Sequence, residues 1–120
     1  MKPGSLILAR LQQSDGRIKS RPALIVSVMP PFDDFLIVGI SSQLRHEVEG
    51  FDELISDSET DFVDSGLKTA SLIRVGMVTT IPVKAAMGEL GAISMGRLAR
   101  IRNNLADHIN AEQADDGGRE

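Results

Sequence analysis

Residues 23–40 read Ala-Leu-Ile-Val-Ser-Val-Met, then Pro-Pro-Phe-Asp-Asp-Phe, then Leu-Ile-Val-Gly-Ile. The two apolar runs, residues 23–29 and 36–40, are rich in β-branched residues and are separated by turn-forming residues. Apolar runs of about 4 to 8 residues that are bounded by Pro, Gly and Asp are typical of buried strands. This stretch therefore predicts two strands that are neighbours in the chain and are joined by a turn.

The same pattern continues on both sides of this stretch. Short apolar runs occupy residues 6–11, 71–75 and 77–83, and a short edge strand is expected at residues 53–56. A doubly wound α/β fold would need helices that alternate with the strands, and the sequence shows no such alternation. We therefore predict a mostly β fold, a small and mainly antiparallel barrel.

The last third of the chain changes period. Apolar residues then recur three or four positions apart, which predicts an amphipathic helix with Ser94 as its N-cap and its end near Asn110. The apolar residues of this face are Leu98, Ile101, Leu105 and Ile109. We expect the helix to pack against the barrel, with Arg97, Arg100 and Arg102 on or beside its solvent face.

Length and composition set the broad class. The chain has 120 residues, 42% hydrophobic and 25% charged, which suits one soluble globular domain. We expect residues 1–110 to form this domain and residues 111–120 to be an acidic, disordered tail. Without an apolar run of about 18 residues or a signal segment, we expect a cytoplasmic protein that does not enter a membrane.

Cysteine is absent, which excludes disulfides and thiolate chemistry. The two histidines, His46 and His108, lie far apart in the sequence. This composition supports neither a zinc site nor a thiol nucleophile, and we expect no metal and no cofactor.

The net charge of -4 hides a segregation of charge. Residues 52–66 carry six acids and no Lys or Arg, and residues 111–120 carry four acids and one Arg. The rest of the chain has 12 basic and 7 acidic residues, so a polyanionic partner is compatible with this sequence. Both acidic segments are expected to be solvated.

The connection from Gln12 to Arg21 is polar and basic. We interpret it as a mobile loop whose cations Arg17 and Lys19 could contact phosphate, although a solvated hairpin would have the same composition. Arg21 differs because Pro22 and the following strand restrict its backbone. A cation held in place is worth more to a catalytic site than a mobile one.

Polar residues also follow the run at 36–40. Ser41, Ser42 and Gln43 stand at the end of a predicted strand and could donate hydrogen bonds to a phosphate, although such residues also serve as turn formers. His46 follows closely and is a candidate proton acceptor, although loop histidines are often only solvated. The four phenylalanines are the only aromatic residues, which argues against a dedicated platform for stacking bases.

The order of these landmarks resembles the MazF/PemK family of toxins. The landmarks are Pro3-Gly4, Arg21-Pro22-Ala23, Ile40-Ser41-Ser42-Gln43, Gly66-Leu67-Lys68, Ser71-Leu72-Ile73-Arg74, Thr79-Thr80-Ile81 and Leu90-Gly91, followed by the terminal helix. The resemblance runs from about Lys2 to Ile109. It implies a small SH3-like antiparallel β-barrel, of the CcdB/MazF/PemK type, with a C-terminal α-helix.

The resemblance also implies a function. Many members of this family are homodimeric toxins of type II toxin–antitoxin systems, cleave single-stranded RNA without a metal ion, and are neutralised by a cognate antitoxin. The family pattern implies that Arg21 and Ser41 are catalytic, and the products would carry 2′,3′-cyclic phosphate and 5′-OH ends. Arg17, Lys19, Ser42, Gln43 and His46 would then contact the RNA, and the general base stays unassigned.

Four departures from the family pattern keep other functions open. Ser5 stands where an acidic residue is usual, Ser41 where Thr is common, and Val75-Gly76-Met77 where polar or charged residues are common. Residues 51–66 are also unusually acidic and would repel RNA if they folded across the site. A second hypothesis is therefore that the chain is a member of the same fold that has lost catalysis or that acts on a protein target. Gyrase-directed relatives of this fold act on a protein target. A third is an unrelated small barrel with a structural role.

Overall fold

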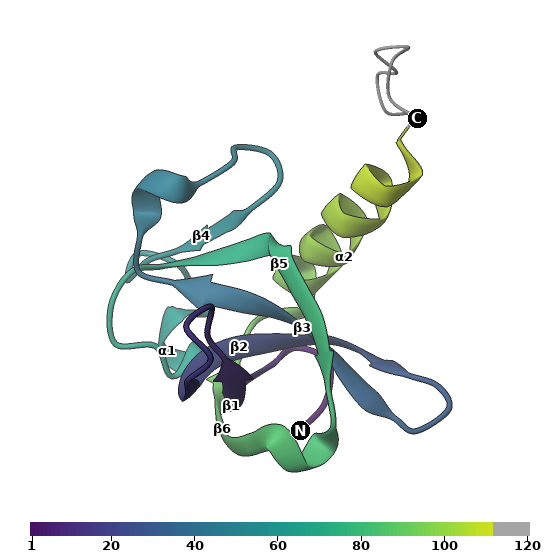
Figure 1. Cartoon of the computed structure of the whole chain (residues 1–120). Coiled ribbons are helices and arrows are strands. Elements are labelled where there is room, and N and C mark those ends of the chain that lie inside the picture. The colour runs from purple at the N-terminus through teal and green to yellow at the C-terminus, as the bar shows by residue number, and fades with distance from the viewer. Residues whose placement is uncertain (112–120) are drawn as a thin grey trace.

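A computed structural model describes residues 1–111 of the chain. The described part forms one antiparallel six-stranded sheet with the strand order β4-β5-β3-β2-β1-β6, and its last helix, α2, lies beside the sheet (Figure 1). The elements in chain order are β1 (Ser5–Gln12), β2 (Ile18–Met29), β3 (Asp34–Ser41), the 3₁₀ turn η1 (Leu44–His46), β4 (Glu53–Ile55), α1 (Phe62–Ser65), β5 (Ser71–Ile81), the 3₁₀ turn η2 (Val83–Ala85), β6 (Ala86–Ala92) and α2 (Met95–Asn110). The mostly β fold with a C-terminal helix is confirmed. The expected tail, residues 111–120, falls outside the described residues except for Ala111.

Three elements differ from the sequence expectation. The runs at 71–75 and 77–83 form the single strand β5, which carries a bulge: Gly39 pairs with Arg74 while the adjacent Val38 pairs with Val78. Strand β6 escapes the apolar-run criterion because it contains two glycines and no β-branched residue, and its pairing with β1 holds it in the sheet. The short helix α1 was also missed, because a four-residue helix has too little periodicity to detect.

The sheet curls into a half-barrel with apolar side chains on both faces (Figure 1). Residues i and i+2 of a strand share a face, so Ile37 faces the inner cluster with Ile25 and Phe35, while Val38 faces the outer cluster beneath α2. The outer cluster joins strands β1, β2, β3, β4 and β5 to α2 through Leu6, Leu24, Val26, Val38, Ile55, Ile73, Val75, Ile93, Leu98 and Ile101. The inner cluster comprises Ile7, Ala9, Ala23, Ile25, Phe35, Ile37 and Ile81, which come from strands β1, β2, β3 and β5.

Helix α2 begins as predicted, because the Ser94 hydroxyl accepts a hydrogen bond from the backbone N–H of Arg97 at 3.2 Å. Leu98 and Ile101 are buried and Leu105 packs at the edge of the outer cluster, as expected. Ile109 is 69% exposed, however, because the last turns of α2 extend beyond the sheet (Figure 1).

The environments of Arg97 and of the acidic segment differ most from the sequence expectation. Arg97 is 3% exposed and binds Glu53, Glu59 and Asp61, each with an N–O distance of 2.9 Å. The hydrogen bond from Arg97 lowers the pKa of Asp61 from 3.8 to about 2. The segment around residues 53–61 is therefore not freely solvated, since it pairs with a guanidinium that was expected on the solvent face of α2.

Candidate functional site

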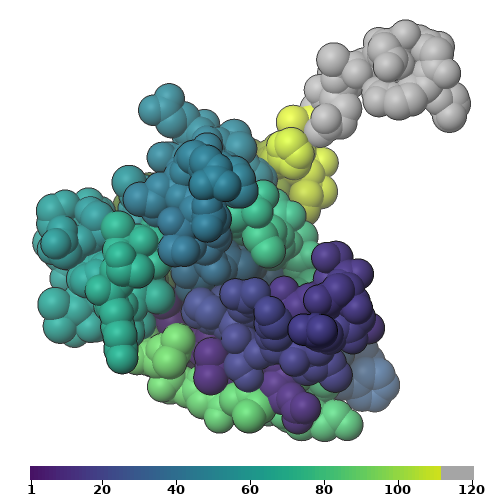
Figure 2. Space-filling model, turned by 60° about the vertical axis from the view of Figure 1, so that its left-hand side comes forward, coloured from purple at the N-terminus to yellow at the C-terminus, as the bar shows by residue number. Residues whose placement is uncertain are grey.

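A groove of about 800 Å³ is lined by residues of β1, β2, β3 and β5 and of the segments that connect them. Figure 2 shows the molecule turned by 60°, with the first two strands in purple and dark blue and the segments after β3 and before β5 in blue and teal. All of these segments contribute side chains to the groove. Its lining comprises Leu11, Gln12, Gln13, Ser14, Arg21, Pro22, Gly39, Ile40, Ser41, Ser42, Gln43, His46, Leu67, Lys68, Thr69, Ser71, Arg74 and Met77.

The structure brings five of the seven predicted site residues to this groove. Those five are Arg21, Ser41, Ser42, Gln43 and His46. The other two, Arg17 and Lys19, are exposed and are not part of the lining. Arg17 is in the turn, where its backbone N–H donates to Asp15 Oδ1 at 2.9 Å, and Lys19 pairs with Leu11 in the β1–β2 ladder. Half of the predicted mobile loop is therefore strand, and its turn is limited to residues 13–17.

The pairing of β2 with β3 explains how Arg21 and Ser41 reach the same groove. Ala23 pairs with Gly39 at the end of the β2–β3 ladder, and Arg21 and Ser41 lie two residues beyond that pair on their strands. Residues two positions apart on a strand share a face, so both side chains lie on the face of Ala23 and Gly39, and both line the groove. The guanidinium of Arg21 is exposed to solvent and donates one long hydrogen bond, 3.5 Å, to the Gln13 side chain. Its remaining N–H groups are thus available to an anion in the groove.

The Ser41 side chain is fixed by the turn that follows β3. Its Oγ accepts a hydrogen bond from the backbone N–H of Gln43 at 3.0 Å, and Ser41 is half-buried. A hydroxyl oxygen that accepts still has its own O–H to donate. The Gln43 side chain in turn accepts a hydrogen bond from Arg45. The turn after β3 therefore orients the Ser41 hydroxyl in the groove that Arg21 also lines.

Sequence reasoning did not assign to the site the groove residues that precede or lie on β5. Lys68, Thr69 and Arg74 all line the groove, and Arg74 pairs with Gly39 in the β3–β5 ladder. The quoted motifs contained Lys68 and Arg74, but nothing in their spacing indicates that they approach Arg21. Within residues 1–111, no acidic residue is among the lining residues, so the acidic segment at residues 52–66 does not cover the groove.

Asp52 links the segment that follows η1 to the bulge of β5. It is 7% exposed, and its carboxylate accepts hydrogen bonds from the backbone N–H of Val48 at 2.9 Å and of Val75 at 3.0 Å. Val75 belongs to the bulge of β5, where its N–H has no partner in the strand ladder. Asp52 therefore fixes the bulge beside Arg74 and the segment that carries His46.

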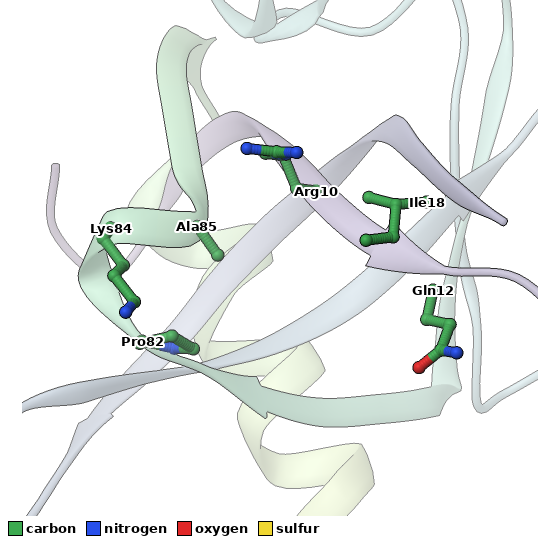
Figure 3. A pocket seen from close by; sticks show the side chains of 6 residues that line it. All are labelled: Arg10, Gln12, Ile18, Pro82, Lys84 and Ala85. Atoms are coloured by element: carbon green, nitrogen blue, oxygen red, sulfur yellow. The ribbon is translucent and has the colours of Figure 1, made fainter. Parts of the chain in front are cut away.

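A second, smaller hollow of about 520 Å³ lies where η2 approaches the β1–β2 hairpin. It is lined by Arg10, Gln12, Ile18, Pro82, Lys84 and Ala85 (Figure 3). Its two cations come from β1 and η2 and do not point toward one another in Figure 3. The hollow has no hydroxyl or imidazole group, so the larger groove is the better candidate for chemistry.

The larger groove combines guanidinium, ammonium, hydroxyl and imidazole groups without a carboxylate. Such a set suits a phosphate, because Arg presents paired donors to phosphate oxygens and imidazole can transfer a proton near neutral pH. Within residues 1–111, no three His, Cys, Asp or Glu side chains are grouped closely enough to hold a metal ion. None of the helices in this range is long and apolar enough to cross a membrane.

Residues 2–109 match the family of PemK-like, MazF-like toxins of type II toxin–antitoxin systems. No curated protein sequence matches the chain. Among solved structures, the toxin MazF-mt6 of Mycobacterium tuberculosis is similar with a TM-score of 0.66 and 17% identity, over 91% of this chain and 99% of that one.

Two further similar structures contain antitoxins. One is an endoribonuclease in complex with its cognate antitoxin from a mycobacterial species, with a TM-score of 0.68 and 14% identity over 94% of this chain and 98% of that one. The other is the MazE–MazF structure from Deinococcus radiodurans, with a TM-score of 0.64 and 14% identity over 93% and 97%. At these identities the likeness establishes the fold.

Proposed function

Because this chain belongs to the PemK-like, MazF-like toxins of type II toxin–antitoxin systems, we propose that it is an endoribonuclease that cleaves single-stranded messenger RNA. The observation that carries the proposal is the convergence of Arg21, Ser41 and His46 on one groove. Two more cations, Lys68 and Arg74, line the same groove, and none of the acidic residues in the described part of the chain does. A polyanionic RNA backbone is drawn to such a surface. A protein with a similar fold is named an endoribonuclease, which agrees with this proposal.

The reaction is attack of a ribose 2′-oxygen on the adjacent phosphorus. The P–O5′ bond breaks, the 2′-hydroxyl loses its proton, and the leaving O5′ gains one, so the products carry a 2′,3′-cyclic phosphate and a 5′-OH. Because an arginine stays protonated, Arg21 stabilises the extra negative charge of the phosphorane-like transition state. Ser41 donates its O–H to a phosphate oxygen and so orients the phosphate.

His46 is the remaining groove residue suited to the proton transfers. Imidazole takes up and releases protons near neutral pH, whereas the groove's arginines do not. We assign to His46 the uptake of the 2′-hydroxyl proton, and the leaving O5′ takes its proton from water. No step of this scheme requires a metal ion, so cleavage should persist in EDTA.

We also propose two protein partners. A free strand edge on β5 supports a homodimer. On the side of β5 away from β3, β4 pairs only with Ser71–Ile73, so within residues 1–111 no strand pairs with that side of residues 74–81, where Val78 is 41% exposed.

A cognate antitoxin is the second partner, by analogy with the two structures that contain one. We propose that the protein acts in the cytoplasm, where its RNA substrate is found. Light scattering reports whether the purified protein has twice the mass of one chain.

The Arg21→Ala substitution tests the proposed function. We expect wild-type protein in EDTA to cut long single-stranded RNA at discrete positions, and the substitution to slow cleavage by about 100-fold or more, because one donor to the transition state is lost. Arg21 is exposed, so the thermal midpoint should stay close to that of the wild type. Sequencing the fragments and phosphorylating their 5′-OH ends identifies the cuts.

Lys19→Ala is the matched control, because Lys19 is a cation on the same strand that does not line the groove. We expect this variant to cleave at close to the wild-type rate. A folded wild-type protein that cleaves none of a varied set of RNAs would overturn the proposal and favour a binding function for the groove. Equal rates for Arg21→Ala and the wild type would remove Arg21 from the mechanism.

A further inference from the structure

The groove has no Phe, Tyr or Trp side chain against which a base could stack. The chain has no Tyr or Trp, and none of its four phenylalanines lines the groove, so His46 supplies the one aromatic ring among the described lining residues. Phe32 is 80% exposed in the β2–β3 turn, while Phe35 is buried in the inner cluster and Phe51 and Phe62 pack at the outer one. Because His46 is assigned to proton transfer, an apolar side chain of the groove is the better candidate for contact with a base.

Met77 is the most exposed apolar side chain of the groove. It is 46% exposed, whereas Leu11, Ile40 and Leu67 in the same lining are half-buried against the clusters. Met77 belongs to the bulge of β5, the three residues that have no partner between the Gly39–Arg74 and Val38–Val78 pairs. The bulge redirects this side chain into the groove.

Gly39 forms the floor beneath Met77. A Cβ added at Gly39 would lie 3.0 Å from Cε, 3.2 Å from Sδ and 3.2 Å from Cβ of Met77, so the methionine runs across the bare backbone of β3. Gly39 is buried and Met77 is not, so one side of the thioether rests on the strand and the other side is open. The glycine lets the thioether lie flat in the groove.

This thioether lies next to the groups assigned to the reaction. Gly39 and Ser41 are two residues apart on β3 and so lie on the same face, about 7 Å apart along the strand. Arg74 is directly opposite Gly39, and Arg21 lines the same groove. An apolar surface is therefore surrounded by hydrogen-bond donors for phosphate, with no acid in the lining.

We propose that Met77 is a specificity-determining residue, on which a nucleobase next to the cleaved phosphate packs. The inference rests on the proposed function of the groove. Methionine is polarisable and makes favourable contacts with aromatic rings, and a base on the thioether takes the place of stacking on an aromatic side chain. Purines and pyrimidines differ in size and in stacking strength. Contact with the flat face of a base therefore favours one of these two classes.

The test compares Met77→Ala and Met77→Leu with the wild type on a pool of random-sequence single-stranded RNA in EDTA. Sequencing of the fragment ends reports the nucleotides on both sides of each cut. We expect Met77→Ala to keep cleaving while its preference at one position beside the cut falls about five- to tenfold, since the contact with that base is lost. Met77→Leu should keep most of the preference because it retains an apolar surface of similar volume.

Two further variants separate this role from general damage. Gly39→Ala should weaken the preference at the same position, since its added Cβ displaces Met77. Met87→Ala is the control, because Met87 is 55% exposed on β6 and is outside the groove, so its cleavage pattern should match the wild type. Cleavage by Met77→Ala with the wild-type base preference would overturn the proposal for Met77 alone. Absence of cleavage by the folded wild type would overturn the proposed function, and the inference with it.

Discussion

The Asp61→Asn substitution removes one negative charge from the cluster around the buried Arg97 and preserves the size of the side chain. Asp61 is 6% exposed, and its Oδ2 accepts hydrogen bonds from the Arg97 Nε at 2.9 Å and from the Ser94 backbone N–H at 3.0 Å. Glu53 and Glu59 remain beside Arg97 in the variant. The substitution therefore weakens the link between the acidic segment and α2 without leaving the guanidinium unpaired.

The magnitude of the effect follows from the pKa of Asp61, which the hydrogen bond from Arg97 lowers from 3.8 to about 2. Because one pKa unit corresponds to about 1.4 kcal/mol, the ionised carboxylate adds about 2 kcal/mol to the free energy of unfolding near neutral pH. The folded-state pKa is the lower one, so this stabilisation is present above pH 3.8 and is lost as the pH falls through about 2. Less than about 1 kcal/mol of it remains at pH 2.5.

Urea unfolding at pH 6 and at pH 2.5 measures this difference. We expect Asp61→Asn to lower the free energy of unfolding by about 2 kcal/mol at pH 6 and by less than about 1 kcal/mol at pH 2.5. Asp57→Asn removes the same charge from an exposed position of the same segment and should cost less than about 0.5 kcal/mol. A deficit for Asp61→Asn that is equal at both pH values, or absent at pH 6, would refute the role assigned to the ionised carboxylate.

Two further substitutions test packing and the bulge. A Cβ at Gly91 would lie 2.2 Å from a carbonyl oxygen of α1, whereas at Gly88 it would meet nothing within 4 Å, so Gly91→Ala should lower the melting midpoint by roughly 10 °C and Gly88→Ala should lower it little. Equal midpoints in circular dichroism would contradict this. Asp52→Ala removes the acceptor of the Val48 and Val75 N–H groups and should cost about 1 to 3 kcal/mol, with faster hydrogen exchange at both amides. Unchanged protection of these amides in NMR would show that the bulge is held by other contacts.

The sheet was largely predictable because most of its strands have a local signature. The runs at residues 6–11, 23–29 and 36–40 contain the residues that later pair and pack, and β1, β2 and β3 extend those runs by a few residues. Strand β6 lacks such a signature and is held by its pairing with β1. Only contacts with residues distant in the sequence distinguish it from a loop.

The candidate site was predictable only in part, for a similar reason. Arg21 and Ser41 are adjacent to strands that the sequence predicts to be neighbours, so a single hairpin register brings them together. Lys68 and Arg74 join them through the pairing of β3 with β5, across more than 30 residues of chain. Met77 enters the groove because of a bulge, and an irregular register has no signature in a short apolar run.

The sequence by itself determined the class of fold, the start of the terminal helix at Ser94 and the resemblance to a toxin family, since these depend on local periodicity, capping and the order of short motifs. Only the tertiary structure decided the state of the charges. Arg97 and the acidic segment both suggest solvated surface when each is considered alone, yet they form a buried ion cluster. The physical reason is that the cost of burying a charge depends on its partner, and these partners are 36 to 44 residues apart.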